Sequence, residues 1–170
     1  MHRFELTSDL LTGMSDIDNQ HRALLDLANE VLYGDLDEEP LLFQRALSFL
    51  SNYIIYHFTA EEAAMTESGY PRARFHQEFH DRLRRAFSAL VTQAANEGVS
   101  KALKLAIYFL LEDWLLYHIR ETDRELAAFL RDTSPGGTIR RLPEIRPLKA
   151  SGALPAEFDE RVLAGVSAIR

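Results

Sequence analysis

Apolar residues recur at helical spacing over most of the chain up to Arg131, in four stretches that are separated by short breaks. The first stretch begins after Asp16 and Asp18, which are good helix N-cap residues, and ends near Gly34. Its apolar positions share one face, which is typical of an amphipathic helix packed against a core. They are Leu24, Leu25, Leu27, Ala28, Val31 and Leu32.

Three further helices follow from the same pattern. The segment 37–40 places acids and a proline where a first helical turn favours them, and this second helix should end at Gly69. Pro71 opens a third helix that ends near Gly98, and a fourth covers roughly residues 99–131. Because short connections make neighbouring helices antiparallel, we predict an all-α fold: an up-down-up-down four-helix bundle with an N-terminal arm and a C-terminal extension.

The composition of the chain changes after residue 132. A run of small and helix-breaking residues begins at Thr133, and three more prolines follow it. We therefore predict the bundle over residues 1–132 and a Pro/Gly-punctuated extension over residues 133–170, with one short amphipathic helix at 156–169. The extension is basic, whereas the whole chain has a net charge of −7. The extension is a candidate contact for a protein partner.

Composition excludes several classes of function. The chain has no cysteine, which rules out disulfides, iron–sulfur clusters, thiolate zinc sites and a cysteine nucleophile. The acidic balance argues against a nucleic-acid partner, whose binding surface would be basic. No run reaches the ~18 apolar residues of a membrane span, and the N-terminus has no apolar leader. We therefore expect no membrane association and a cytoplasmic location, with nitrogen and oxygen ligands for any metal chemistry.

Five of the six histidines lie within the predicted helices. His57 and Glu61 are one turn apart on the second helix, and His76 and His80 are one turn apart on the third. A lone helical histidine is usually a half-buried side chain with a hydrogen bond, and a single His/Glu pair is often a surface contact. The joint pattern favours a metal, because buried imidazoles without one would leave polar nitrogens unsatisfied at about 1–3 kcal/mol each. The first and fourth helices add one imidazole each, from His21 and His118.

A second carboxylate on the fourth helix is harder to assign. Asp123 follows His118 by five residues, which is about 140° around a regular α-helix. Both side chains can face one centre only if the helix widens locally into a π-turn, which aligns residues five apart. Glu121 is the other candidate, and from spacing alone either carboxylate could be solvated.

These residues resemble the metal-binding motifs of the bacterial hemerythrins, and the resemblance covers roughly residues 10–131. All seven ligand positions of that family have a matching residue here. The matching segments are Ile17-Asp18-Asn19-Gln20-His21, His57-Phe58 with Glu61, Gly69-Tyr70-Pro71 followed by His76 and His80, and His118-Ile119 with Asp123 and a closing Leu126 to Leu130.

The resemblance implies a non-haem di-iron centre that binds O2 reversibly, in an oxygen carrier, store or sensor that is not an enzyme. Three histidines would hold one of the two Fe ions and two would hold the other. By resemblance, the first iron would take His76, His80 and His118, and the second would take His21 and His57.

The family also implies bridging groups and an apolar pocket. Glu61 and Asp123 would bridge the two irons, with a solvent-derived oxygen as a third bridge, and O2 would bind at the iron that has two histidines. Reversible binding requires a dry pocket without proton donors. The positions that match the family's apolar pocket are Leu24, Phe58, Trp114 and Ile119.

Two other functions stay open at this point. The first is a di-iron oxidoreductase acting on peroxide or nitric oxide, and Tyr53, one turn before His57, would favour turnover if its phenol donated a proton. The second is an O2-sensing or redox-sensing signalling module that works through residues 133–170. The ferritin-like type of di-iron enzyme is disfavoured, because no glutamate lies three residues before any helical histidine.

Overall fold

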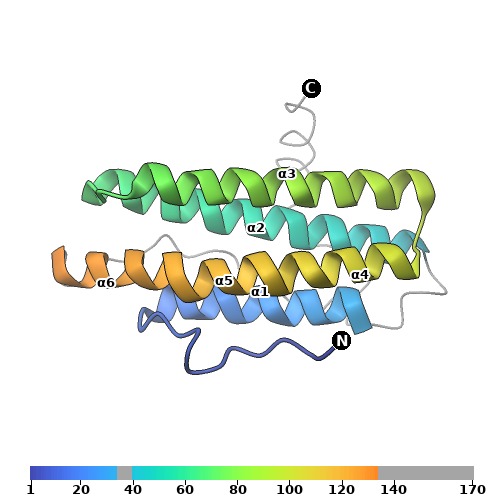
Figure 1. The fold of residues 1–170 in the computed structure, drawn as a ribbon, viewed down its shortest axis with the longest axis horizontal. Coiled ribbons are helices and arrows are strands. Elements are labelled where there is room, and N and C mark those ends of the chain that lie inside the picture. The colour runs from blue at the N-terminus through green and yellow to red at the C-terminus, as the bar shows by residue number, and fades with distance from the viewer. Residues whose placement is uncertain (34–39, 134–170) are drawn as a thin grey trace.

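The computed structural model describes residues 1–33 and 40–133, and these form four antiparallel helical rods (Figure 1). The first three rods are α1 (Ser15–Tyr33), α2 (Pro40–Ser68) and α3 (Ala73–Glu97). The fold is the predicted all-α four-helix bundle. The predicted extension over residues 133–170, apart from its first residue, and its short helix at 156–169 lie outside the described residues.

The fourth rod is one long helix with two widened sections. Its segments are α4 (Lys101–Phe109), η1 (Leu110–Leu115), α5 (Leu116–His118), η2 (Ile119–Asp123) and α6 (Arg124–Thr133), of which η1 and η2 are π-helical. None of the helices described has both the length and the apolar character of a membrane span.

Local sequence signals set the helix ends. Gly69 and Gly98 have φ values of +67° and +77°, a left-handed conformation that glycine adopts without strain and that stops α2 and α3. The Ser100 side chain then caps the fourth rod by accepting a hydrogen bond of 3.1 Å from the Leu103 backbone N–H.

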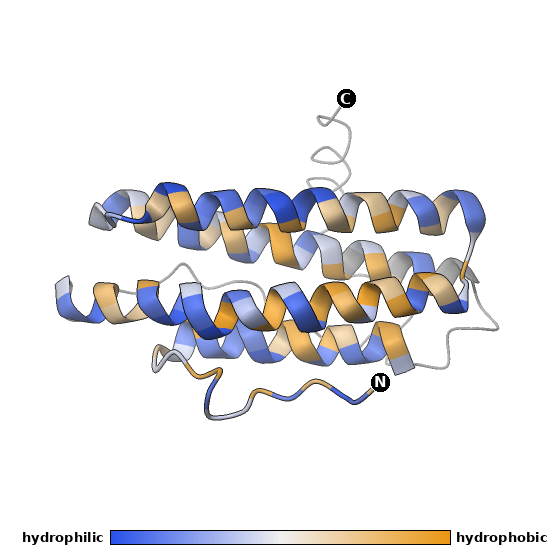
Figure 2. Ribbon diagram, viewed as in Figure 1, coloured by the Kyte–Doolittle hydropathy of each residue, from blue (hydrophilic) through white to orange (hydrophobic). Residues whose placement is uncertain are grey.

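The core consists of two apolar clusters at different heights in the bundle. Apolar and polar residues alternate in bands along each helix, because only one side of a helix faces the core (Figure 2). The larger cluster includes Leu24, Ile54 and Ile119, whereas Ile17 and Leu126 belong to the smaller one. Most of the buried histidines and carboxylates occupy the helical turns between the two clusters.

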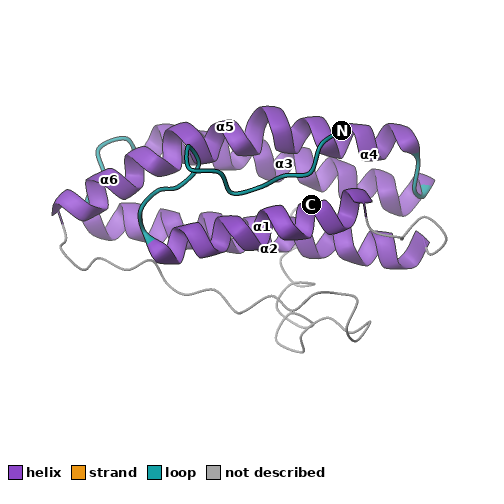
Figure 3. Cartoon of the chain, turned by 90° about the horizontal axis from the view of Figure 1, so that it is seen from below, coloured by secondary structure: helices purple, strands orange, loops and turns teal. Residues whose placement is uncertain are grey.

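The N-terminal arm runs along the bundle between α1 and the fourth rod (Figure 3). Phe4 and Leu10 are 3% and 2% exposed, and they anchor the arm in the larger cluster. The Asn29 side chain hydrogen-bonds both the N–H and the carbonyl of Phe4, each at 2.8 Å. Asp18 accepts hydrogen bonds from the backbone and hydroxyl of Thr12 at 2.7 and 2.8 Å, which fixes the turn into α1.

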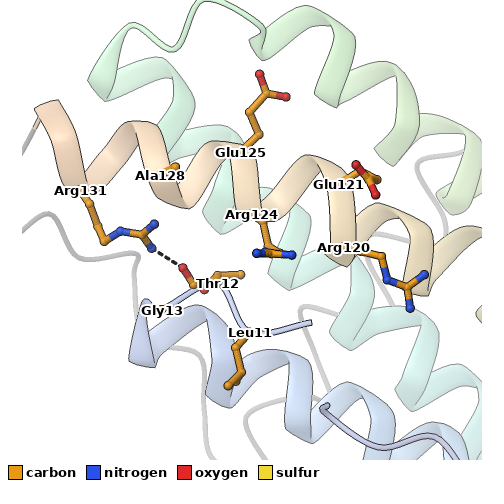
Figure 4. Close-up of a pocket in the computed structure, with 9 residues that line it drawn as sticks. All are labelled: Leu11, Thr12, Gly13, Arg120, Glu121, Arg124, Glu125, Ala128 and Arg131. Carbon is orange, nitrogen blue, oxygen red and sulfur yellow. Dashed lines mark hydrogen bonds between the residues drawn. The ribbon is translucent and has the colours of Figure 1, made fainter. Parts of the chain in front are cut away.

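A surface cavity of about 570 Å³ lies where the arm meets the fourth rod (Figure 4). Three arginines of the rod reach across it to the arm. Arg120 pairs with the Asp9 carboxylate at 2.9 Å, Arg124 donates to the Asp9 carbonyl, and Arg131 donates to the carbonyl of Thr12. These arginines hold the arm in place, and none of the histidines lines this cavity.

Replacing Asn29 with alanine should lower the free energy of unfolding by about 1–3 kcal/mol, because two backbone groups of the buried arm lose their partners. Urea denaturation measures the change. The control is Asn19→Ala, since Asn19 makes only an exposed contact with Arg22 among the described hydrogen bonds, and its effect should stay within about 0.5 kcal/mol. Equal effects of the two substitutions would contradict the anchoring role of Asn29.

Candidate metal centre

Five imidazoles and two carboxylates from all four rods meet between the two apolar clusters, and each of these side chains is at most 1% exposed. Their ligand atoms form two groups. In each group, every ligand atom lies within 4.8 Å of the others. The two carboxylates belong to both groups, so the groups adjoin. The larger group is Glu61, His76, His80, His118 and Asp123, and the smaller is His21, His57, Glu61 and Asp123.

The Asp123 carboxylate spans the two groups with its two oxygens. Oδ1 lies 2.9 Å from His118 Nε2 and 3.2 Å from His76 Nε2, both in the larger group. Oδ2 lies 3.1 Å from His21 Nε2 and 4.0 Å from His57 Nε2, both in the smaller group. A carboxylate in this position can bind a different cation through each oxygen.

Glu61 approaches both groups mainly through one oxygen. Its Oε2 lies 3.2 Å from His80 Nε2 and 3.4 Å from His76 Nε2 in the larger group. The same oxygen lies 3.8 Å from His57 Nε2, on the other side. The one-turn spacing of His57 and Glu61 on α2 therefore brings both side chains into the interior, as their sequence separation predicts.

Asp123 reaches the interior because the fourth rod widens at η2 (Ile119–Asp123). In a regular α-helix, Asp123 would lie about 140° from His118. The π-helical section aligns residues five apart, which confirms the widening that the sequence predicts between these two residues. Glu121, the other candidate carboxylate, is exposed and faces away from the cluster.

The ring nitrogens and carboxylate oxygens of the cluster face one another without good hydrogen bonding. His21 Nε2 lies 3.2 Å from His57 Nε2, and His80 Nε2 lies 3.1 Å from His118 Nε2. Seven buried polar atoms, several within 3.5 Å of a neighbour, have no aligned hydrogen-bond partner among the described residues. They are His21 Nδ1, both oxygens of Glu61, both ring nitrogens of His76 and both oxygens of Asp123.

Such a concentration of buried polar atoms without aligned partners is unfavourable by itself and fits bound cations. Each unsatisfied buried polar group costs about 1–3 kcal/mol. Imidazole and carboxylate together suit iron and other divalent first-row metals. The imidazole and carboxylate donors therefore fit a metal site, and the two adjoining groups fit two neighbouring ions.

Three of the imidazoles also have an outer hydrogen-bond partner at Nδ1. When Nδ1–H donates outward, the ring is held in the tautomer whose Nε2 is free to bind a metal. Each of these partners is next to a ligand position in the sequence or one turn from it, but helix spacing alone does not distinguish it from its neighbours. The pairs are His57 with Gln20 Oε1 at 2.8 Å, His80 with Glu62 Oε1 at 2.7 Å, and His118 with Thr122 Oγ1 at 2.6 Å.

The protonation of the cluster is uneven. Burial alone would lower the pKa of His76, but the neighbouring carboxylates of Asp123 and Glu61 outweigh it and raise that pKa to about 10. For His118 burial dominates, and its pKa falls to about 4. The surrounding imidazoles hold the pKa of both carboxyl groups below the ordinary range despite their burial. The centre therefore carries two carboxylate charges at neutral pH.

The four residues predicted to line an apolar pocket differ in burial. Three of them are fully buried: Leu24, Phe58 and Ile119. Trp114, in contrast, is 39% exposed, and its ring lies 6.4 Å from that of Phe79 on α3. The reason is that Leu115 takes the inward position one turn before Ile119, which leaves Trp114 at the edge of the rod. Leu115 is fully buried, and the lining of an O2 pocket by the four predicted residues stays a prediction.

Tyr53 belongs to the larger apolar cluster and is 2% exposed. Its burial raises the pKa of the phenol above the ordinary value, so the hydroxyl keeps its proton at neutral pH. A proton-donating role for Tyr53 stays an untested prediction.

Metal binding should release protons from this centre. At pH 8 His76 keeps a proton in the metal-free protein, because its pKa is raised to about 10, and a cation can bind its Nε2 only after that proton leaves. Affinity for a divalent cation should therefore rise as the pH rises toward about 10. Adding Zn²⁺ to weakly buffered protein with a pH indicator measures the release. A His76→Gln variant that releases as many protons as the unmodified protein would contradict this prediction.

Comparison with known proteins agrees with the fold and with a cation-binding domain. Residues 12–130 match the family described as the Hemerythrin HHE cation binding domain. A bacteriohemerythrin of Pseudomonas aeruginosa is 31% identical over 142 residues, covering 78% of this chain and 90% of that protein. A bacteriohemerythrin of Stenotrophomonas maltophilia is 28% identical with the same coverage.

A solved structure gives the same arrangement of helices. The crystal structure of a hemerythrin leucine-to-alanine mutant aligns with a TM-score of 0.66 and 23% identity, over 76% of this chain and 98% of that one. That likeness supports the fold, and the family match over most of the chain supports the relationship. The chain therefore belongs to the hemerythrin family, whose members are non-enzymatic proteins that bind O2 with non-haem iron.

Proposed function

We propose that this protein binds O2 reversibly at a pair of iron ions, as an oxygen carrier, store or sensor. The observation that carries the proposal is that Glu61 and Asp123 each belong to both donor groups. A single isolated metal would not need two carboxylates shared in this way. Two adjoining cations would, because shared carboxylates offset part of their mutual repulsion.

The proposed assignment of the ligands follows the two groups. One iron would be held by the three imidazoles of the larger group, and the other by the two imidazoles of the smaller group. Glu61 and Asp123 would bridge them. The smaller group supplies one imidazole fewer, which leaves a ligand position for O2. The imidazoles are His76, His80 and His118 for the first iron, and His21 and His57 for the second.

Bound Fe(II) would supply the electrons that O2 takes up on binding and gives back on release. The surrounding protein keeps this exchange reversible by excluding water. Leu24, Phe58 and Ile119 are fully buried apolar side chains, and each lies within one turn of a donor histidine on its own helix. Phe58 lies parallel to the His80 ring at 3.8 Å between centroids, which leaves no room for water on that face. An apolar wall offers no proton to the bound gas, so the ligand can leave as O2.

Anaerobic loading with Fe(II) should give about two irons per chain, and air should then produce a visible charge-transfer band that disappears on purging with argon. The reversal is expected because the buried wall supplies neither water nor protons. Absorption spectroscopy and metal analysis are the measurements. A band that forms irreversibly, or rapid consumption of added peroxide, would overturn reversible binding and favour the oxidoreductase alternative.

Replacing His118 with alanine should reduce the iron content of the loaded protein to about one per chain or less and abolish the reversible band. The reason is that the larger group loses one imidazole and its close contact with Asp123. The matched control is His2→Ala, since His2 lies on the arm and outside both donor groups. Two irons and an unchanged spectrum in the His118 variant would show the ligand assignment to be wrong.

A further inference from the structure

The outer partners of the imidazoles differ in charge. His57 has the neutral amide of Gln20, and His118 has the neutral hydroxyl of Thr122. The partner of His80 is a carboxylate, Glu62, whose Oε1 lies 2.7 Å from His80 Nδ1. Among the three partnered imidazoles, only His80 therefore has a charged group behind it.

Glu62 is itself held by a cation at the surface of the bundle. The same Oε1 accepts a hydrogen bond of 2.8 Å from Arg84 Nη2. Arg84 also pairs with Asp81 at 3.1 Å. The side chains of Glu62 and Arg84 are 25% and 22% exposed, whereas that of His80 is fully buried. The contact thus connects a buried imidazole with a partly solvated ion pair.

Aromatic packing fixes the geometry of this contact. The Phe58 ring lies over the face of the His80 imidazole, with 7° between the ring planes, and the Arg84 guanidinium lies 5.4 Å from the Phe58 centroid. His80 is therefore held on its face by Phe58 and at its Nδ1 edge by Glu62. Tilting the ring would break the stacking on Phe58, and flipping it would break the hydrogen bond to Glu62.

A carboxylate in this position alters what the imidazole offers to a metal. Accepting the Nδ1 proton in a charge-assisted hydrogen bond makes the opposite nitrogen, Nε2, a stronger electron donor. The added negative charge favours the higher positive charge on a cation bound at Nε2. Arg84, which binds the same oxygen, opposes this effect because it neutralises part of the carboxylate charge.

We propose that Glu62 is a positioning residue that lowers the reduction potential of the iron pair through His80, and that Arg84 limits this effect. The inference rests on the proposed function, since it concerns the metal held by His80. It makes the two donor groups unequal, because in the described structure the smaller group has no carboxylate behind an imidazole. Reducing the pair takes one electron per Fe(III), and a stronger donor at Nε2 makes each of these electrons harder to add.

Substitution of the two residues should move the potential in opposite directions. Glu62→Gln keeps the size of the side chain and removes its charge, and should raise the potential. Arg84→Met keeps the aliphatic stem and removes the restraint on Glu62, and should lower it. A tenfold change in the Fe(III)/Fe(II) equilibrium is expected for Glu62→Gln, which is about 59 mV for one electron. Redox titration of the iron-loaded protein, followed by visible absorption, gives these values.

Two further variants sharpen the test. Gln20→Glu puts a carboxylate behind His57 and should lower the potential, as Glu62 does from the other side. Glu78→Gln removes an exposed charge on α3 that pairs with Arg74, and it should leave the potential unchanged. If the substitutions acted only through lost packing, Glu62→Gln and Arg84→Met would shift the reduction potential in the same direction. That result, or a change of less than twofold in both, would overturn the proposal.

A measurement without iron separates this inference from the proposed function. In zinc-loaded full-length protein, the Nδ1 proton of His80 should give a strongly downfield ¹H–¹⁵N signal, because it is held by a charged acceptor. Glu62→Gln should shift that signal upfield, and Glu78→Gln should leave it in place. If the protein binds no iron, the proposed function fails although this signal still reports the His80–Glu62 contact. An unchanged signal in Glu62→Gln would overturn the contact itself.

Discussion

Seven polar side chains are buried together in one layer of the bundle, and the packing of all four rods has to accommodate them. Five imidazoles and two carboxylates are at most 1% exposed, and several of their polar atoms have no aligned partner among the described residues. The packing elsewhere must offset this cost. The apolar core accordingly lies in two clusters, with Ile54 and Leu24 on one side of the polar layer and Ile17 and Leu126 on the other. Cations between the donor atoms would turn the unfavourable contacts into ligand bonds.

The fourth rod shows how the backbone adapts to this polar layer. His118 and Asp123 both face the interior because η2 has π-helical geometry, and a regular α-helix would turn one of them away. Widened turns of this kind are rare and are often found at functional sites. Leu115 and Ile119 are fully buried on this rod, whereas Trp114 lies at its edge near Phe79.

Polar contacts continue outward from the polar layer and differ between the rods. Gln20, Thr122 and Glu62 hold three of the imidazoles from behind, and only the last of these carries a charge and reaches Arg84 near the surface. The arm is tied to the same region, because Asp18 lies one turn before His21 on α1 and holds the turn at Thr12. The buried imidazoles are thus oriented both by packing within the bundle and by hydrogen bonds to residues farther from its centre.

The four helices could be predicted from local signals in the chain, namely the apolar period, the proline and the glycine breaks. The spacing also paired His57 with Glu61 and His76 with His80, because residues four apart share a helix face. Spacing alone left Asp123 and Glu121 as alternatives, and family resemblance favoured Asp123. Three further features could not be predicted in this way: the exposure of Trp114, the inward position of Leu115 and the pairing of Glu62 with His80. Each of these depends on how one helix is rotated against another, and that rotation is set by packing between residues far apart in the chain.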